Sequence, residues 1–308
     1  MTTESFGDLS PQKSHMNHPL KFLLLACLLA AQTPKVIAQY HEGSAGAKRY
    51  KNTSRPSDLN KPSPIDRHDT VFIEEMTWME VRDAKQDGKS TILIPTGGIE
   101  QNGPYVALGK HNYVLRQDCE AIARGLGDAL VAPIVPFVPE GNHSPKSHHM
   151  RYPGTISITE ETFERLLVDI ATSFKVHGFE HIFLLGDSGD NQYGMERVAE
   201  QLSSRWRDEP TKVHYISEYY DPGAIEDWLK TKGIIEKDEG LHDRYRYEAQ
   251  ILTLEPEHIR LSQRLDAGLG SINGISLLPI ERTYAIGWQL IAFQADRTIK
   301  AIKTRLKE

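Results

Sequence analysis

Carboxylates and imidazoles gather in short polar segments of the chain that are rich in glycine and proline. One segment reads GGIEQNGPYVALGKHN and carries Glu100 and His111. Another reads GDSGDN and places Asp187 and Asp190 on a tight glycine-rich turn. A mixture of carboxylate and imidazole ligands suits a divalent ion such as zinc or manganese. Neither segment has a diagnostic ligand spacing, so the pattern alone leaves purely structural roles open.

Two further segments bring more histidines. The segment EGNHSPKSHHMRYPGTIS contains His143, His148 and His149, and EGLHDRYRYEA contains His242 and Glu248. An imidazole near a carboxylate can move a proton to a leaving group. We expect His143 and His148 to lie in a solvated loop.

The elements that position these residues alternate between strand and helix. Such alternation predicts an α/β domain with a mostly parallel sheet, in which ligands bind at the carboxyl ends of the strands. The first two polar segments follow predicted strands, so their side chains are expected to meet there. The predicted strands cover 91–95, 130–137, 181–185 and 213–217, and the predicted helices cover 113–126, 157–177 (capped by Ser157 with Glu160 and stopped by Gly178), 193–206 and 284–308.

Three separate motifs resemble the creatininase (creatinine amidohydrolase) family. IPTGGIEQNGPYVALGKHN is similar to the family's Pro-x-Gly-Ser-x-Glu-Gln-His-Gly-Pro-His-Leu-Pro-Leu-Gly-Thr-Asp. HHMRYPGTISI is similar to its His-x-x-Phe-Pro-Gly-Thr-Ile-Ser-Leu, and HGFEHIFLLGDSGDNQ to its His-Gly-Phe, strand and Asn-Gly-His-Gly-Gly-Asn. The resemblance covers residues 70–260. It implies a three-layer α/β/α fold, a homohexamer, and a metal-dependent hydrolase of cyclic amides and related C–N bonds with two metal ions.

The family's ligand positions carry over unevenly. Its glutamate is kept as Glu100, and the carboxylate that some members have in the last motif matches Asp190. Its first histidine is Asn102 here, its aspartate is His111, and its last histidine is Ser188. Asn and Ser are poor zinc ligands, although their oxygens can bind a hard cation. The family's histidine before Pro-Gly-Thr matches His149.

A remodelled metal site is the interpretation we favour over a decayed one. A new histidine at a lost ligand position, beside a retained glutamate, is not the usual result of random decay. Asp187 can supply a replacement carboxylate. The predicted site has Glu100, His111, Asp187 and Asp190 as metal ligands, His242 and Glu248 as catalytic residues, and His149, Asn102 and Ser188 as substrate contacts.

Other functions and structural roles remain open at this point. Glu100 or His111 can brace its loop, and Asp187 and Asp190 can stabilise their turn. A decayed site would leave an exported protein that binds a small molecule without catalysis. A Gly-Asp-Ser block also presents the serine nucleophile of GDS-type esterases, which would make Ser188 a nucleophile. The Asp-x-x-His that such esterases carry near their end does not follow Ser188.

The N-terminus resembles a secretory signal peptide. Lys21 precedes an apolar run at residues 22–31, and small residues allow cleavage after Ala38. Lipid attachment at Cys27 is the alternative. Cleavage after Ala38 would remove Cys27, and lipid attachment would modify it. In either case Cys119 has no partner for an internal disulfide bond. We therefore expect a signal peptide (1–38), a flexible polar linker (39–68) and one α/β domain (69–308), exported to the periplasm or secreted.

Composition excludes several functional classes. The 308 residues are 39% hydrophobic and 25% charged, which is ordinary for a globular protein. The formal charge of −6 gives no basic footprint for nucleic acid. No apolar stretch after the leader is long enough to span a bilayer. The expected partners are a small-molecule substrate and further copies of the chain.

Overall fold

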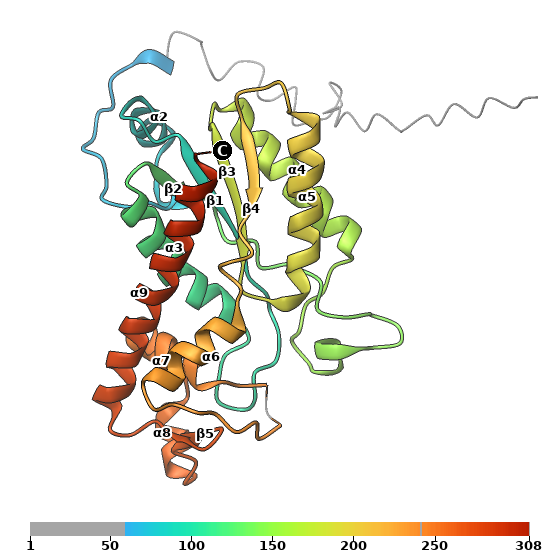
Figure 1. Ribbon diagram of the computed structural model, residues 1–308, viewed down its shortest axis with the longest axis vertical. Coiled ribbons are helices and arrows are strands. Elements are labelled where there is room, and N and C mark those ends of the chain that lie inside the picture. The colour runs from blue at the N-terminus through green and yellow to red at the C-terminus, as the bar shows by residue number, and fades with distance from the viewer. Residues whose placement is uncertain (1–58, 241, 308) are drawn as a thin grey trace, which may run out of the picture. The chain divides into compact units, whose positions relative to one another are not determined.

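The computed structural model describes residues 59–240 and 242–307 (Figure 1). The expected signal peptide and most of the linker lie outside these residues. The described part of the chain belongs to a single compact unit. Arg82 donates hydrogen bonds to the carbonyls of Leu59 and Lys61, which anchor the start of this unit. Within it, no helix is both long and apolar enough to cross a membrane.

A four-stranded parallel sheet forms the centre of the unit. Its order is β2-β1-β3-β4, and β1 pairs with β3 over its whole length. Every residue of β1 is buried, as expected of a parallel strand that is covered on both faces. The parallel sheet predicted from the sequence is confirmed. The strands are β1 (Thr91–Thr96), β2 (Ala129–Val131), β3 (His181–Gly186) and β4 (Lys212–Tyr215).

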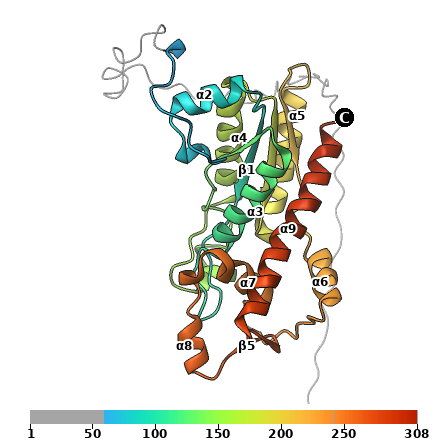
Figure 2. The same cartoon turned by 90° about the vertical axis from the view of Figure 1, so that its left-hand side faces the viewer.

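Helices cover both faces of this sheet. Figures 1 and 2 show α4 (Glu160–Val176) and α5 (Gln192–Arg205) on one face, and α3 (Lys110–Leu126) and α9 (Ile280–Arg305) on the other. Alternate residues of β1 point to opposite faces and join different cores. The result is the expected three-layer α/β/α fold. Ile92 and Ile94 pack in the core with α4 and α5, and Leu93 packs in the core with α3 and α9.

The remaining helices were not predicted. Helix α2 (Trp78–Gln86) begins at a capping box between Thr77 and Glu80. Beyond the carboxyl ends of the strands lie α6 (Pro222–Thr231), α7 (Tyr245–Leu254), α8 (Leu261–Asp266) and a small hairpin of β5 (Ser271–Ile272) and β6 (Ile275–Ser276). Short 3-10 helices cover Ile73–Glu75, His148–Arg151, Gly189–Asn191 and Pro256–His258.

Several predicted boundaries were wrong, for identifiable reasons. The strand predicted at 130–137 stops at Val131, because its prolines cannot donate to a ladder. Ser157 does not cap α4. Thr159 does, while the Ser157 hydroxyl binds the backbone of Glu140 and Gly141. Helix α9 begins at Ile280, before the predicted start.

One glycine sets how α7 lies against α9. A Cβ atom on Gly287 of α9 would fall 2.1 Å from the carbonyl oxygen of Ala249 and 2.1 Å from Thr253 Oγ1, both on α7. Only a glycine permits this approach. Since α7 carries Arg246 and Tyr247, the contact holds two residues of the site in place.

Candidate active site

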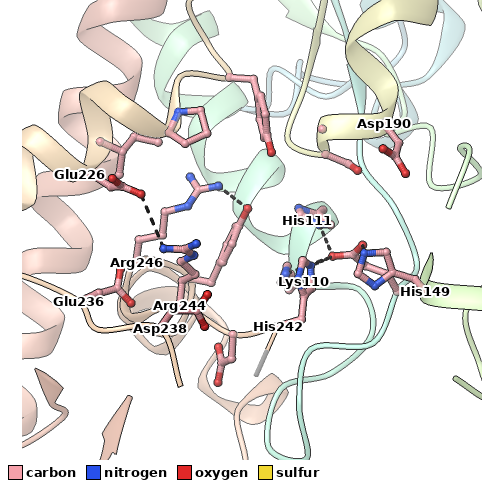
Figure 3. A pocket seen from close by; sticks show the side chains of 18 of the residues that line it. Lys110, His111, His149, Asp190, Glu226, Glu236, Asp238, His242, Arg244 and Arg246 are labelled. Atoms are coloured by element: carbon pink, nitrogen blue, oxygen red, sulfur yellow. Dashed lines mark hydrogen bonds and ion pairs between the residues drawn. The ribbon is translucent and has the colours of Figure 1, made fainter. Parts of the chain in front are cut away.

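Four nitrogen-bearing side chains converge on the carboxylate of Glu100, in the loop that follows β1. Glu100 Oε1 lies 2.7 Å from His111 Nε2, 2.8 Å from His242 Nε2 and 3.2 Å from Lys110 Nζ. Its Oε2 lies 3.1 Å from His149 Nε2. Figure 3 shows the four nitrogen-bearing side chains on one side of the cavity. Burial raises the pKa of Glu100, but hydrogen bonds from His111 and His242 outweigh burial and hold it well below its ordinary value.

Three of these residues could hold a metal ion. Ligand atoms of Glu100, His149 and His242 all lie within 4.8 Å of one another. One glutamate with two histidines is a ligand set of catalytic zinc sites, which leave a fourth position for water or substrate. Burial lowers the pKa of His149, which keeps its ring neutral and available as a ligand. The donor set therefore fits a divalent ion.

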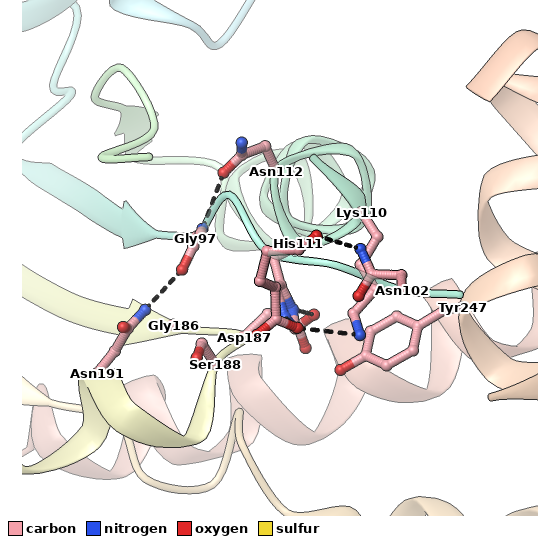
Figure 4. Close-up of polar contacts among 12 residues, drawn as sticks. Gly97, Asn102, Lys110, His111, Asn112, Gly186, Asp187, Ser188, Asn191 and Tyr247 are labelled. Atoms are coloured by element: carbon pink, nitrogen blue, oxygen red, sulfur yellow. Dashed lines mark hydrogen bonds and ion pairs between the residues drawn. The ribbon is translucent and has the colours of Figure 1, made fainter. Parts of the chain in front are cut away.

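His111 lies between two carboxylates in a buried network (Figure 4). It stands in the first turn of α3, with Nε2 on Glu100 and Nδ1 2.8 Å from Asp187 Oδ2. The other oxygen of Asp187 accepts from Arg246 at 3.2 Å, and Arg246 also contacts the Tyr247 hydroxyl. Burial raises the pKa of Asp187, but Arg246 and His111 outweigh it and lower the pKa overall. Both ring nitrogens of His111 thus have partners.

Lys110 places a positive charge inside this network. Its side chain is 1% exposed, and its ammonium lies 4.5 Å from the ring centre of Tyr247. Burial lowers the pKa of Lys110, and the charge of Glu100 opposes that change. The two carboxylates of Glu100 and Asp187 are therefore matched by the two cations of Lys110 and Arg246. This part of the site is electrically balanced by side chains alone.

Glu140 is a further carboxyl group at the site. It is 0% exposed, and within the described residues neither of its side-chain oxygens has a hydrogen-bond partner. Burial, followed by the charge of Glu100, raises the pKa of Glu140 to about 10. Among the described residues, Glu140 could donate a hydrogen bond only in its protonated form, to the neighbouring carboxylate of Glu100.

A cavity of about 370 Å³ opens onto these residues. Its size suits a small molecule. Its walls carry charges of both signs, and His148, expected in a solvated loop, is part of them. They include Glu100, Lys110, His111, Glu140, His149, Ser188, Asp190, Tyr220, Glu226, His242, Arg244 and Arg246.

Asn102, Glu248 and Asp187 lie outside this lining, and of the three Asp187 joins the His111 network behind it. Asn102 is buried and donates to the carbonyls of Glu100 and Ala107, so it braces the loop that carries Glu100. Glu248 is buried on α7 with Arg264 Nη1 2.5 Å from its Oε1. Burial, followed by the charge of Asp243, raises the pKa of Glu248 to about 9.

The other predicted residues line the cavity. Ser188 lines the wall, but among the described residues no hydrogen bond joins its hydroxyl to a histidine. Asp190 is exposed at the same wall, and Asp187 lies behind it against His111.

Sequence reasoning missed Lys110 and Glu140. A signal for Lys110 was present, because it stands where the resembling motif has threonine, next to a ligand position. Glu140 had no such signal, because it lies in a loop without a matching motif residue.

A protein-family model matches most of the described residues. Residues 74–291 match the creatininase model, described as creatinine amidohydrolase. This range contains every residue of the site described above.

Curated relatives share limited sequence identity with the chain. The chain is 27% identical over 168 residues to 3-dehydro-scyllo-inosose hydrolase of Thermotoga maritima, covering 54% of this chain and 50% of the relative. It is 26% identical over 123 residues to creatinine amidohydrolase of Pseudomonas putida, covering 40% of this chain and 46% of the relative. The chain therefore spans about half the length of the curated relatives that it matches.

Solved structures share the fold. A creatininase in a manganese form superposes with a TM-score of 0.55 at 19% identity, over 77% of this chain and 98% of the other. A creatinine amidohydrolase crystal structure gives the same TM-score at 18% identity, over 78% and 97%. At this identity the likeness establishes the α/β fold alone.

Proposed function

The chain belongs to the creatininase family, and on that premise we propose that it is a metal-dependent hydrolase that acts on a small polar molecule. The bond cleaved is a cyclic amide or related C–N bond, or a ring C–C bond next to a ketone. The relatives named above support this class, since one is a creatinine amidohydrolase and another an inosose hydrolase.

The convergence of Glu100, His149 and His242 carries this proposal. These three residues would hold one divalent ion. The set suggested by the sequence shares Glu100 with them but has His111, Asp187 and Asp190 as its other ligands. His111 and Asp187 already bind each other, which favours a supporting role for both. Zinc and manganese both suit the ligands, and solved creatininases include a manganese form and a Zn-Zn form.

A bound ion would act as a Lewis acid, which would polarise a carbonyl group and allow water to act as a nucleophile at neutral pH. The protein's own residues then have separable tasks. His111 and Lys110 contact the carboxylate of Glu100 and fix its orientation, as partners of metal ligands commonly do. The exposed carboxylate of Asp190, which lines the same cavity, accepts the proton released by water and passes it to the leaving group.

The cavity sets the size and polarity of the substrate. About 370 Å³ accommodates a single small ring with its substituents. Carboxylates and guanidinium groups in the same wall favour a molecule with both hydrogen-bond donors and acceptors. Cyclic amides and sugar-derived cyclic ketones satisfy both conditions.

A non-catalytic binder is the second candidate. Lys110 and Arg246 already balance the charges of Glu100 and Asp187, so the network is complete without an ion. This candidate predicts a ligand-dependent rise in melting temperature that a chelator does not change.

A serine hydrolase has less support. The Ser188 hydroxyl lines the cavity, but within the described residues no histidine binds it as a base would. Labelling of Ser188 by a fluorophosphonate would bring this mechanism back.

Export and assembly are further proposals. The apolar run at residues 22–31 supports cleavage after Ala38, which N-terminal sequencing of the exported protein tests. A homo-oligomer, a hexamer by family resemblance, is tested by analytical ultracentrifugation.

Activity after metal removal and restoration tests the main proposal. The protein is treated with a chelator, reloaded with zinc or manganese, and assayed against panels of cyclic amides and cyclic ketones. We expect hydrolysis that the chelator abolishes and the metal restores. The absence of both metal binding and turnover on either panel would favour the binder, and turnover that resists the chelator would contradict the metal mechanism.

A further inference from the structure

Glu140 has no partner in a place where burial makes one necessary. A buried polar group without a hydrogen bond is destabilising, and natural proteins rarely keep one without a reason. Both oxygens of Glu140 lack a partner among the described residues, although the residue is 0% exposed. After burial, the carboxylate of Glu100 raises the pKa of Glu140 most, and Glu140 could donate a hydrogen bond to that carboxylate only while it carries a proton. A cation is the kind of partner that this position lacks.

The surrounding backbone holds Glu140 at the cavity wall. The Ser157 hydroxyl accepts from the Glu140 amide at 2.8 Å and donates to the carbonyl of Gly141 at 2.8 Å. These bonds fix the backbone on both sides of the residue. Gly98 leaves room for the carboxyl group, because a Cβ atom there would lie 2.5 Å from Glu140 Oε1. The position is therefore built to carry a glutamate side chain against the loop of Glu100.

We propose that Glu140 supplies a further oxygen ligand to the divalent ion held by Glu100, His149 and His242, an inference that rests on the proposed function. Glu140 lines the same cavity as those three residues. Metal binding displaces the proton of a carboxyl ligand, so Glu140 would enter the ligand set as a second carboxylate and add a negative charge beside the divalent ion.

Metal affinity tests this assignment without relying on turnover. The full-length protein and its Glu140→Gln variant are titrated with Zn²⁺ in competition with a chromogenic chelator. Each protein is also loaded with Co²⁺, whose visible absorption depends on the number and type of its ligands. The amide of glutamine has nearly the shape of a carboxylic acid, so the fold should tolerate the change. Far-UV circular dichroism and a cooperative thermal transition verify this.

Two further variants make the result specific. Glu226→Gln is the matched control, because Glu226 is an exposed carboxylate of the same cavity, 3.7 Å from Arg244. Gly98→Ala keeps all proposed ligands but pushes the Glu140 carboxyl from its place.

We expect Glu140→Gln to weaken Zn²⁺ binding at least about tenfold and to change the Co²⁺ spectrum. Gly98→Ala should weaken binding in the same direction, and Glu226→Gln should stay within about twofold of the unaltered protein. Unchanged affinity and spectrum in Glu140→Gln, with metal lost in Glu100→Gln, would overturn the role of Glu140 and leave the proposed function intact. Absence of metal binding by the unaltered protein would overturn both.

Discussion

The ammonium of Lys110 lies 3.2 Å from Glu100 Oε1, with both side chains almost fully buried. A fixed cation thus touches the carboxylate that we assign to the metal ion. It limits the positive charge that the site accepts and favours one ion rather than two.

Replacing Lys110 tests this competition. In Lys110→Met, Glu100 loses a buried charge partner. Such a loss destabilises a protein by about 3–5 kcal/mol, and we expect the lower end of this range because other donors to Glu100 remain. Added Zn²⁺ should restore much of that stability. We therefore expect the Zn²⁺-dependent rise in melting temperature to be larger in Lys110→Met than in the unaltered protein. Equal rises measured by differential scanning calorimetry would mean that Lys110 and the ion do not share Glu100.

The ion pair between Asp187 and Arg246 should contribute far more than exposed pairs do. Asp187→Asn leaves the Arg246 guanidinium buried without a charged partner, at an expected loss of about 3 kcal/mol in the free energy of unfolding. Arg197→Ala is the control, since Arg197 binds Glu160 and Glu164 at the surface and should contribute under about 1 kcal/mol. Urea unfolding measures both variants. Similar losses would show that the buried network is not a special source of stability.

Asp118 should make stability fall as pH rises. Burial raises its pKa from 3.8 to about 8, so the folded protein binds a proton that the unfolded chain releases above its own pKa. Between those values the folded state holds more protons, and its stability declines by up to about 1.4 kcal/mol per pH unit.

Asp118→Asn removes this dependence. Its amide can still accept from the Tyr219 hydroxyl, and Gln250 can turn its amide to keep the other contact. As the pH increases from 5 to 8, the melting temperature of the variant should rise relative to that of the unaltered protein. Parallel curves over this range would show that Asp118 titrates normally.

The crossing of α7 and α9 should depend on Gly287. An alanine there would place Cβ 2.1 Å from the Ala249 carbonyl oxygen, and overpacking of this kind costs about 1–3 kcal/mol or more. Gly125→Ala is the control, because its Cβ would meet only the mobile end of Ile299. We expect the melting temperature to fall in Gly287→Ala and to hold or rise in Gly125→Ala. Equal behaviour would indicate that the two helices separate without loss.

The sheet and its flanking helices could be predicted because they follow local patterns. Residues 91–95 and 181–185 are short apolar runs, each followed by a glycine within two residues, and both became central strands. Helix α7 gave no such signal. It is buried on nearly every side, so its apolar residues show no single face.

The site could be predicted only in part, because its ligands come from distant segments. Glu100 was recognisable from its motif, but nothing local shows that His149 and His242 meet it. The partnership of His111 with Asp187 depends on the pairing of β1 with β3, which brings the two loops together. Glu140 lines the cavity because of the course of its loop, which the local sequence does not indicate.

Metal content per chain tests the central claim most directly. The full-length protein and the variants Glu100→Gln, His149→Ala, His242→Ala and Asp190→Asn are purified, reconstituted with zinc or manganese, dialysed and analysed by plasma mass spectrometry. The account predicts about one equivalent of metal in the unaltered protein and in Asp190→Asn, and a loss in each of the other three variants. No metal in the unaltered protein, or full retention in all three ligand variants, would contradict it.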